Sequence, residues 1–184
     1  MAMSDGLEVT VAFPPHVLRE YALLADGQRG ALVGPRGDIA WMCAPSWDSG
    51  AVFSSLLGGG GCYGVTPADQ RFVWGGYYEV GTLIWRSKWI TTGGAIECRE
   101  ALAYPGDPRT VVLLRRIEAA GAPARVRVLL DVQADFSHYK MSRLQSGDGV
   151  WAARSGPLQV RWSGAATARH ADSGALELIL DLQP

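Results

Sequence analysis

The chain has 184 residues, of which 48% are hydrophobic and 19% charged, and its formal net charge is −1. This balance is typical of one globular domain with a buried core, and it excludes a disordered chain. Because no basic run is present, nucleic-acid binding is excluded as well. No apolar run is long enough to cross a membrane, and the first ten residues lack the apolar stretch of a signal peptide. We therefore expect a cytoplasmic protein without membrane contact.

The cysteines and histidines give no sign of a metal site. Cys43, Cys62 and Cys98 are an odd, widely spaced set without a Cys-x-x-Cys pair, which favours buried free thiols over a disulfide. The three histidines lie far apart in the sequence, so none of them is paired at ligand spacing. We expect neither a metal nor a cofactor.

The first third of the chain combines short strands with one helix. Strands are expected at Tyr21–Ala25, Ala31–Val33 and Ile39–Cys43. A short helix is expected over Ser49–Leu57, because a serine can cap its first turn, apolar residues recur at helical spacing and Gly58 can end it.

From residue 77 onward, apolar and polar residues alternate with the period of a strand. Strands are expected at Tyr78–Thr91, Ala95–Leu102, Thr110–Glu118, Val126–Val132, Val150–Arg154, Leu158–Trp162 and Leu176–Leu182. Turns rich in glycine, proline and aspartate separate them at short intervals. This pattern predicts an all-β, antiparallel β-sandwich formed by residues 1–184. Because the last strand ends at the end of the chain, we expect the sandwich to be incomplete there.

Catalytic motifs are absent from this pattern. Glycoside hydrolysis requires two carboxylates that face one cleft. Glu97 and Glu100 fall on opposite faces of one expected strand, and the other glutamates lie mostly at positions predicted to face solvent. There is no Gly-x-Ser-x-Gly motif either. We expect the chain by itself to be inactive.

The densest group of polar and aromatic residues follows the third expected strand. Pro45 prevents that strand from continuing, and Trp47 and Asp48 lie on the loop after it, where binding residues concentrate. Two roles stay open for Asp48: it caps the next helix or fixes the loop through hydrogen bonds, or it lies at an interface or sugar site. Trp41 and Cys43 are expected in the core.

A set of residues in this first third keeps a fixed spacing over more than thirty positions. They are Tyr21-Ala22-Leu23, Asp26, Ala31-Leu32-Val33, Gly37, Ile39, Trp41, Cys43, Pro45, Asp48-Ser49, Phe53 and Leu56-Leu57. In this the chain resembles the opening of glycoside hydrolase family 15, of the bacterial glucoamylase, glucodextranase and trehalase-like type. Looser matches follow at Thr82–Ser87, at Arg115–Glu118 with Gly121, and at Asp135-Phe136 with Tyr139.

The chain also departs from the family's pattern. Ala25 replaces a glycine, Arg36-Gly37-Asp38 replaces Asp-Gly-Ser, and Trp47 replaces a phenylalanine. Ala40 stands where the family has an aspartate before the tryptophan, which puts in doubt any polar role of that position.

The resemblance implies a non-catalytic N-terminal β-sandwich of the super-sandwich type that packs on an (α/α)6 barrel. In the family the barrel supplies both catalytic glutamates for an inverting hydrolysis of α-glucosidic bonds, and that barrel is absent from these 184 residues. The implied partners are the chain's own downstream catalytic domain and, through it, an α-glucoside or oligosaccharide. The expected interdomain or substrate-mouth residues are Trp47, Asp48 and Ser49, and the structural motif is Trp41, Cys43 and Pro45.

Two other functions compete with this hypothesis. A free-standing carbohydrate-binding module would use exposed tryptophans such as Trp74, Trp85 or Trp89 as a stacking platform. A structural or interaction protein would make no contact with sugar. If the sandwich is incomplete, the strand Leu176–Leu182 is an exposed edge, and we expect the chain to self-associate.

Overall fold

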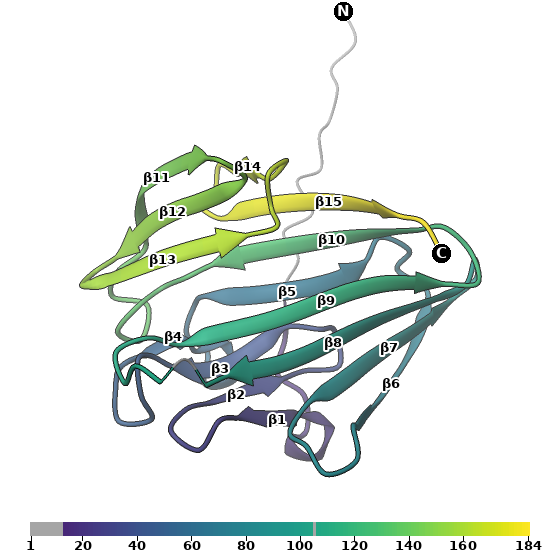
Figure 1. The fold of residues 1–184 in the computed structure, drawn as a ribbon, viewed down its shortest axis with the longest axis horizontal. Coiled ribbons are helices and arrows are strands. Elements are labelled where there is room, and N and C mark those ends of the chain that lie inside the picture. Colours follow the sequence, from purple (N-terminus) through teal and green to yellow (C-terminus); the bar gives the residue numbers. More distant parts are fainter. Residues whose placement is uncertain (1–12, 105) are drawn as a thin grey trace, which may run out of the picture.

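The structure is a computed structural model that describes residues 13–104 and 106–184. It is almost entirely β, with antiparallel pairing throughout, which confirms the predicted fold class (Figure 1). The helical segments within the described residues are two 3-10 turns, η1 (Leu18–Glu20) and η2 (Ser55–Leu57). None of these is long or apolar enough to cross a membrane.

Four sheets enclose one core in a sandwich-like arrangement (Figure 1). The first sheet has the order β1 (Ala22–Ala25), β2 (Gly30–Val33), β3 (Ile39–Cys43), β4 (Ala51–Phe53). The second has the order β14 (Arg169–His170), β15 (Leu176–Leu182), β10 (Ala124–Asp131), β5 (Cys62–Pro67). The third is β6 (Phe72–Tyr78), β7 (Trp85–Thr91), β8 (Ala95–Ala103), β9 (Val112–Ala120), and the fourth is β11 (Met141–Gly147), β12 (Val150–Ser155), β13 (Leu158–Ser163).

The core follows from the alternation of each strand. In β10, Val126 and Val128 are buried between solvent-facing arginines, and the paired strand β15 buries Leu176 and Leu178 on the same side. Trp89 is fully buried, and its indole N–H donates to the carbonyl of a proline in the β2–β3 turn. One shared apolar interior therefore holds the sheets together.

A buried ion pair also links the sheets. Arg115 of β9 donates to the Glu100 carboxylate at 2.8 Å, and both side chains are almost completely buried. The Arg115 guanidinium further donates to the Tyr63 carbonyl of β5 and lies 4.7 Å from the centre of the Tyr63 ring. Ser87 donates to the second Glu100 oxygen at 2.7 Å, so the buried charges have hydrogen-bond partners on both sides.

The helix predicted over Ser49–Leu57 is wrong. Residues of this segment form β4 and then the single 3-10 turn η2, which Gly58 ends with a φ of 79°. β4 pairs with β3 through Met42 and Phe53, so tertiary pairing overrides the apolar spacing that also suits a helix.

The strand predicted over Tyr78–Thr91 is two strands. It breaks at a turn in which the Thr82 amide donates to the Glu79 carbonyl at 3.0 Å, and β6 pairs back on β7. β6 lacks an alternating pattern because it contains Gly75-Gly76. A side chain at Gly76 would collide with the ring of Trp85, so the glycine leaves room for that ring.

Candidate functional site

The loop between β3 and β4 carries the residues expected at an interface. Its Ala44–Pro45 bond is cis, and a tight turn follows in which the Ser49 amide donates to the Ser46 carbonyl at 3.1 Å. Asp48 is exposed and accepts a hydrogen bond from the Ser46 hydroxyl, which holds the pKa of this carboxyl below its ordinary value. Because a strand follows, Asp48 caps no helix, but its hydrogen bond with Ser46 fits the other form of that alternative, in which Asp48 fixes the loop.

A buried arginine holds this loop in place through a hydrogen bond to the loop backbone. Arg29 forms an ion pair with Asp26 at 3.2 Å, and both side chains are only 1% exposed. Its Nε donates to the Pro45 carbonyl at 2.8 Å, and another guanidinium nitrogen donates to the Asp107 carbonyl at 2.8 Å. Three segments distant in sequence are thereby joined at one point. Nothing in the sequence marked Arg29, since a lone arginine in a turn is usually a solvated residue.

Trp41 lies half-buried on the outer face of the first sheet, whereas we expected it in the core with Cys43. Strict alternation from the buried Ile39 would turn Trp41 inward. The register between β2 and β3 shifts instead, so that Val33 pairs with Ile39 but Leu32 pairs with Trp41. This β-bulge reverses the direction of the tryptophan side chain. Cys43 is buried, as predicted.

The outer face of this sheet is apolar. Leu23, Leu32 and Trp41 stand in one row across β1, β2 and β3, because each is the cross-strand partner of the next. The ring of Phe136 lies 6.0 Å from that of Trp41 and continues the row. Leu23 is 38% exposed and Phe136 is 57% exposed.

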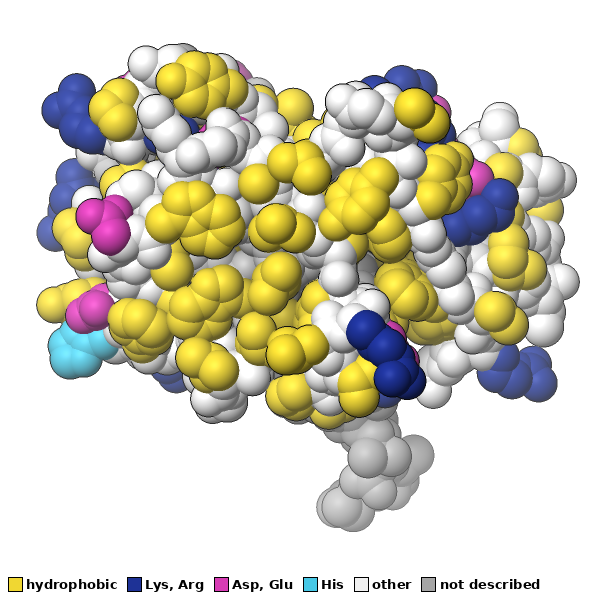
Figure 2. All heavy atoms as spheres, turned by 90° about the horizontal axis from the view of Figure 1, so that it is seen from below, with side chains coloured by type: hydrophobic (Ala, Val, Ile, Leu, Met, Phe, Trp, Pro, Cys, Tyr) yellow, Lys and Arg dark blue, Asp and Glu magenta, His cyan; other side chains and the backbone are white. Residues whose placement is uncertain are grey.

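Two further aromatic residues widen this row. Trp47, which is 48% exposed, lays its ring against the backbone of Gly30, where any side chain would collide with it. The Tyr78 hydroxyl donates to the Leu23 carbonyl at 3.1 Å and accepts from the Leu23 amide at 2.7 Å. We call Leu23, Leu32, Trp41, Trp47, Tyr78 and Phe136 the apolar face. Figure 2 shows hydrophobic side chains gathered across this side of the molecule.

A hollow of about 760 Å³ opens beside the apolar face. It lies between the β3–β4 loop, the loop that follows β10 and the β12–β13 turn. Its lining residues are Ala44, Pro45, Ser49, Gly50, Ala134, Asp135, Tyr139, Gly156, Pro157 and Leu158. The hollow therefore unites Ser49 with Asp135 and Tyr139, which belong to two separate stretches of the family resemblance. Sequence alone did not indicate that these stretches meet.

The loop on one side of the hollow has a strained backbone. Asp135, Phe136 and Ser137 are consecutive residues with φ values of 55°, 53° and 75°. These values lie in the left-handed region, which residues other than glycine rarely adopt. Hydrogen bonds hold them there: the Phe136 amide donates to the Ala51 carbonyl at 3.0 Å, and the Ser137 hydroxyl accepts from the Gly60 amide at 2.6 Å. Such strain persists where the surroundings impose it, and it is concentrated at functional sites.

The carboxylates of the site do not form a catalytic pair. Asp135 is the single carboxylate among the residues that line the hollow. Glu97 and Glu100 lie on opposite faces of β8: Glu97 pairs with Lys88 on the outside, and Glu100 is buried. Within residues 13–104 and 106–184, no three histidine, cysteine, aspartate or glutamate side chains form a group that could hold a metal.

The tryptophans of β6 and β7 are not exposed in the way that a sugar-stacking platform would require. Trp89 is completely buried, and Trp74 and Trp85 are half-buried and pack against each other, with ring centres 6.4 Å apart. Among the described tryptophans, the exposed one is Trp47, which belongs to the apolar face.

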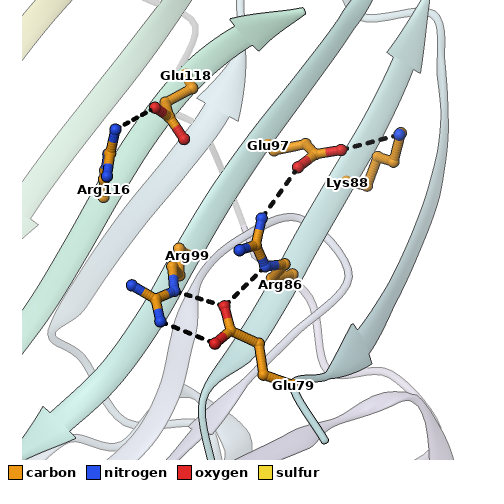
Figure 3. Close-up of polar contacts among 7 residues, drawn as sticks. All are labelled: Glu79, Arg86, Lys88, Glu97, Arg99, Arg116 and Glu118. Carbon is orange, nitrogen blue, oxygen red and sulfur yellow. Dashed lines mark hydrogen bonds and ion pairs between the residues drawn. The ribbon is translucent and has the colours of Figure 1, made fainter.

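The outer face of β6–β9 has a different character, because it carries a group of ion-paired side chains (Figure 3) beside exposed apolar residues such as Val73 and Ile90. Glu79 accepts from Arg86 at 2.8 Å and from Arg99 through both oxygens. Glu97 accepts from Lys88 at 2.9 Å and lies 3.6 Å from Arg86. The remaining ion pair drawn in the figure joins Arg116 to Glu118. We call these seven residues the ion-paired face.

The chain was also compared with known proteins. The family described as trehalase-like, N-terminal matches residues 11–173. A trehalase of Mycobacterium tuberculosis is 34% identical over 109 residues, which are 55% of this chain and 15% of that protein. A trehalase of Mycolicibacterium smegmatis is 35% identical over 97 residues, which are 49% of this chain and 13% of that protein. The chain thus spans a small part of the curated relatives that it matches.

No solved structure matches the chain significantly. The family match covers all of β1 to β14 and includes the three segments that line the hollow. The chain belongs to the trehalase-like N-terminal domain family.

Proposed function

We propose that this chain is the non-catalytic N-terminal domain of a trehalase-like α-glucoside hydrolase of glycoside hydrolase family 15. Its role is to support the catalytic barrel of the same enzyme. The observation that carries this proposal is the apolar face, an exposed row of large side chains on a domain whose relatives continue far beyond the matched segment.

The apolar face fits the catalytic domain as its occupant. A large contiguous apolar surface on a soluble domain marks an interaction site, and interdomain contacts bury such surfaces. In the M. tuberculosis relative the matched segment is 15% of the protein, so most of that chain lies outside the segment. Aromatic side chains such as Trp41, Trp47 and Phe136 are the kind that dominate the energy of protein interfaces.

The hollow supports a place for this domain at the mouth of the substrate site. Asp135 offers a carboxylate for hydrogen bonds with sugar hydroxyls, and Tyr139 offers an aromatic ring against which a sugar can pack. The β3–β4 loop connects the hollow with the apolar face, because Ser49 lines the hollow, Trp47 belongs to the apolar face and Asp48 lies between them in the sequence. Hydrolysis of a glycoside needs a pair of carboxylates, so both catalytic acids come from the barrel.

An association experiment tests the proposal. The domain and the catalytic part of the same enzyme are expressed separately, and their binding is measured by calorimetry. Leu23→Lys places a charge in the apolar face and should weaken binding at least about tenfold, which corresponds to about 1.4 kcal/mol. Val73→Lys is the control, because Val73 is a still more exposed apolar residue that lies on the outside of β6 and not on the apolar face.

Each outcome has a distinct meaning. Weaker binding with Leu23→Lys and unchanged binding with Val73→Lys supports the proposal. Equal loss with both variants, or none with either, contradicts docking through the apolar face. The isolated domain should release no glucose from trehalose, and saturable sugar binding by the domain alone would favour the free-standing carbohydrate-binding module instead.

A further inference from the structure

A second hollow, of about 580 Å³, lies on the outer face of the sheet β11–β12–β13. It is rich in arginine and glutamine: Arg143, Arg154, Arg161, Gln145 and Gln159 all contribute to its lining. Each of these side chains is exposed. The carboxylate of Asp148, on the turn between β11 and β12, is the single acid that lines it.

These arginines differ from those of the other sheets. On β7, β8, β9 and β10, arginine side chains form ion pairs with glutamates or aspartates of the same strand, a neighbouring strand or the β6–β7 turn. In the part of the chain that the structure describes, Arg143, Arg154 and Arg161 make no ion pair and no side-chain hydrogen bond. Three like charges thus lie on one small sheet with Asp148 as the single acid of the hollow, and this excess of positive charge favours an anionic partner.

The register gives the spacing of the charges. Arg154 pairs with Gln159, and Ala152 pairs with Arg161, so the two arginines lie diagonally on neighbouring strands. Diagonal neighbours of this kind are about 7 Å apart. In an extended chain, alternate side chains point to the same side and are also about 7 Å apart. Carboxylates at every second position of an extended segment therefore match the two guanidinium groups.

We infer that the face of β11–β13 binds an acidic polypeptide segment in extended conformation, with glutamates or aspartates at alternate positions. Arg154 and Arg161 each bind one carboxylate, and planar guanidinium groups suit this because they donate two parallel hydrogen bonds. Arg143, which lies within the bulge of β11 and has a φ of 53°, adds a third positive charge. Gln145 and Gln159 lie between the charges and can hydrogen-bond the backbone of the segment.

An isolated oxyanion such as phosphate fits this face less well. A compact anion is held by donors that converge on one point, whereas these guanidinium groups are spread over three strands of an open surface. The extended shape therefore favours a peptide over a single ion.

Peptide binding to the 184-residue chain tests the inference. A ten-residue peptide of alternating glutamate and serine is titrated, and the amide signals of Ala152 and Arg161 are followed by NMR at low ionic strength. A peptide of the same composition with its glutamates in one block is the matched ligand control, and inorganic phosphate is the third probe. The alternating peptide should bind several-fold more tightly than the block, and added salt should weaken it because exposed charges are screened.

Variants locate the site. The double variant Arg154→Ala and Arg161→Ala should weaken binding at least about tenfold, because two charge-assisted contacts are lost. The corresponding double lysine variant keeps both charges and should retain part of the affinity. Arg169→Ala removes an exposed arginine of β14, outside the hollow, and should change nothing. An unchanged melting temperature shows that each variant is folded.

Three results would overturn the inference. The first is the absence of salt-sensitive binding of the alternating peptide. The second is equal affinity for both peptides, or tighter binding of phosphate, since either would show that charge alone or a compact ion is recognised. The third is loss of binding with Arg169→Ala but not with the double alanine variant. None of these results depends on whether the apolar face binds a catalytic domain.

Discussion

Two outer sheet surfaces of this domain differ in the side chains that they expose, since one carries ion pairs and the other carries apolar and aromatic residues. The ion-paired face of β6–β9 presents charged side chains whose partners lie on the same or a neighbouring strand (Figure 3). The apolar face, on the sheet β1–β4, presents leucine, tryptophan and phenylalanine to the surface (Figure 2). The charged groups of the first surface are paired with one another and need no other domain to satisfy them. The second exposes groups that gain free energy only when another surface covers them.

The difference is already present in the strands themselves. Lys88 pairs with Glu97 across β7 and β8 in register, so opposite charges meet without any other part of the protein. On the apolar face the register instead aligns Leu23 with Leu32 and Leu32 with Trp41. A row of exposed apolar side chains does not contribute to the solubility of the domain. The contrast therefore supports the proposal that the apolar face, and not the ion-paired face, contacts another domain.

The largest effect is expected beneath the ion-paired face, where β8 and β9 also carry a buried pair. Glu100→Ala should lower the free energy of unfolding by about 3–5 kcal/mol, because it leaves the Arg115 charge buried without its carboxylate. Urea denaturation measures this change. Glu97→Ala on the outer side of the same strand is the control and should have a much smaller effect. Similar losses for both variants would show that the two faces of β8 do not differ.

Self-association should distinguish the apolar face from the strand edge. β15 pairs along its length with β10, but β14 pairs with it only at Leu176 and Glu177, so the rest of this second edge pairs with no other strand of residues 13–104 and 106–184. If the apolar face drives association of the isolated domain, Leu23→Lys should weaken it at least about tenfold, while Ile179→Lys on β15 changes little. Sedimentation velocity over a range of concentrations measures both. The reverse ranking would identify the edge strand as the contact.

Much of the fold could be predicted because alternation is a local signal. β3 and β15 were predicted with their observed bounds, since both have apolar residues bounded by turns. β6 and β11 were missed, because their sequences are rich in glycine and polar residues and do not alternate. The helix expected at Ser49–Leu57 failed for a different reason, since only pairing with β3 makes that segment a strand.

The candidate site was predictable only in part. Trp47 and Asp48 are exposed on the loop where they were expected, but whether they contact a catalytic domain stays a prediction. Trp41 faces outward because of a bulge, which depends on the register of two strands and not on the residues of β3 alone. Arg29 is buried through contacts with Pro45 and with a loop more than seventy positions away in sequence, and single-sequence patterns carry no information about such contacts.

Phe136 should separate stability from binding. Its φ of 53° disfavours a phenylalanine, and its ring is mostly exposed, so Phe136→Asn relieves backbone strain while it removes one ring contact with Trp41. The two effects are each about 1 kcal/mol. We expect the free energy of unfolding of the isolated domain to stay within about 1 kcal/mol of the original, while binding to the catalytic part weakens. A large loss of stability measured by urea denaturation would show that the ring serves the fold.

The smallest effect concerns the acid resistance of the ion-paired face. The hydrogen bonds donated by Arg99 and, after it, by Arg86 lower the pKa of Glu79 from its ordinary value of 4.5 to about 2. Because the folded state favours the charged carboxylate, Glu79 stabilises the fold above pH 4.5, and this contribution fades as the pH falls towards 2. A carboxyl-carbon NMR titration should therefore place the Glu79 midpoint near pH 2.

The variant Arg99→Gln tests the cause of this shift. This variant removes the hydrogen bonds that contribute most to the lowered pKa of Glu79. The titration midpoint of Glu79 should therefore rise towards 4.5, although Arg86 still keeps it somewhat below that value. The effect on stability should be small and should decrease with added salt, because the pair is at the surface. A wild-type midpoint already near 4.5 would show that the arginines do not hold Glu79 in solution. The ion-paired face would then be an ordinary charged surface, and its contrast with the apolar face would rest on the exposed leucine and aromatic side chains alone.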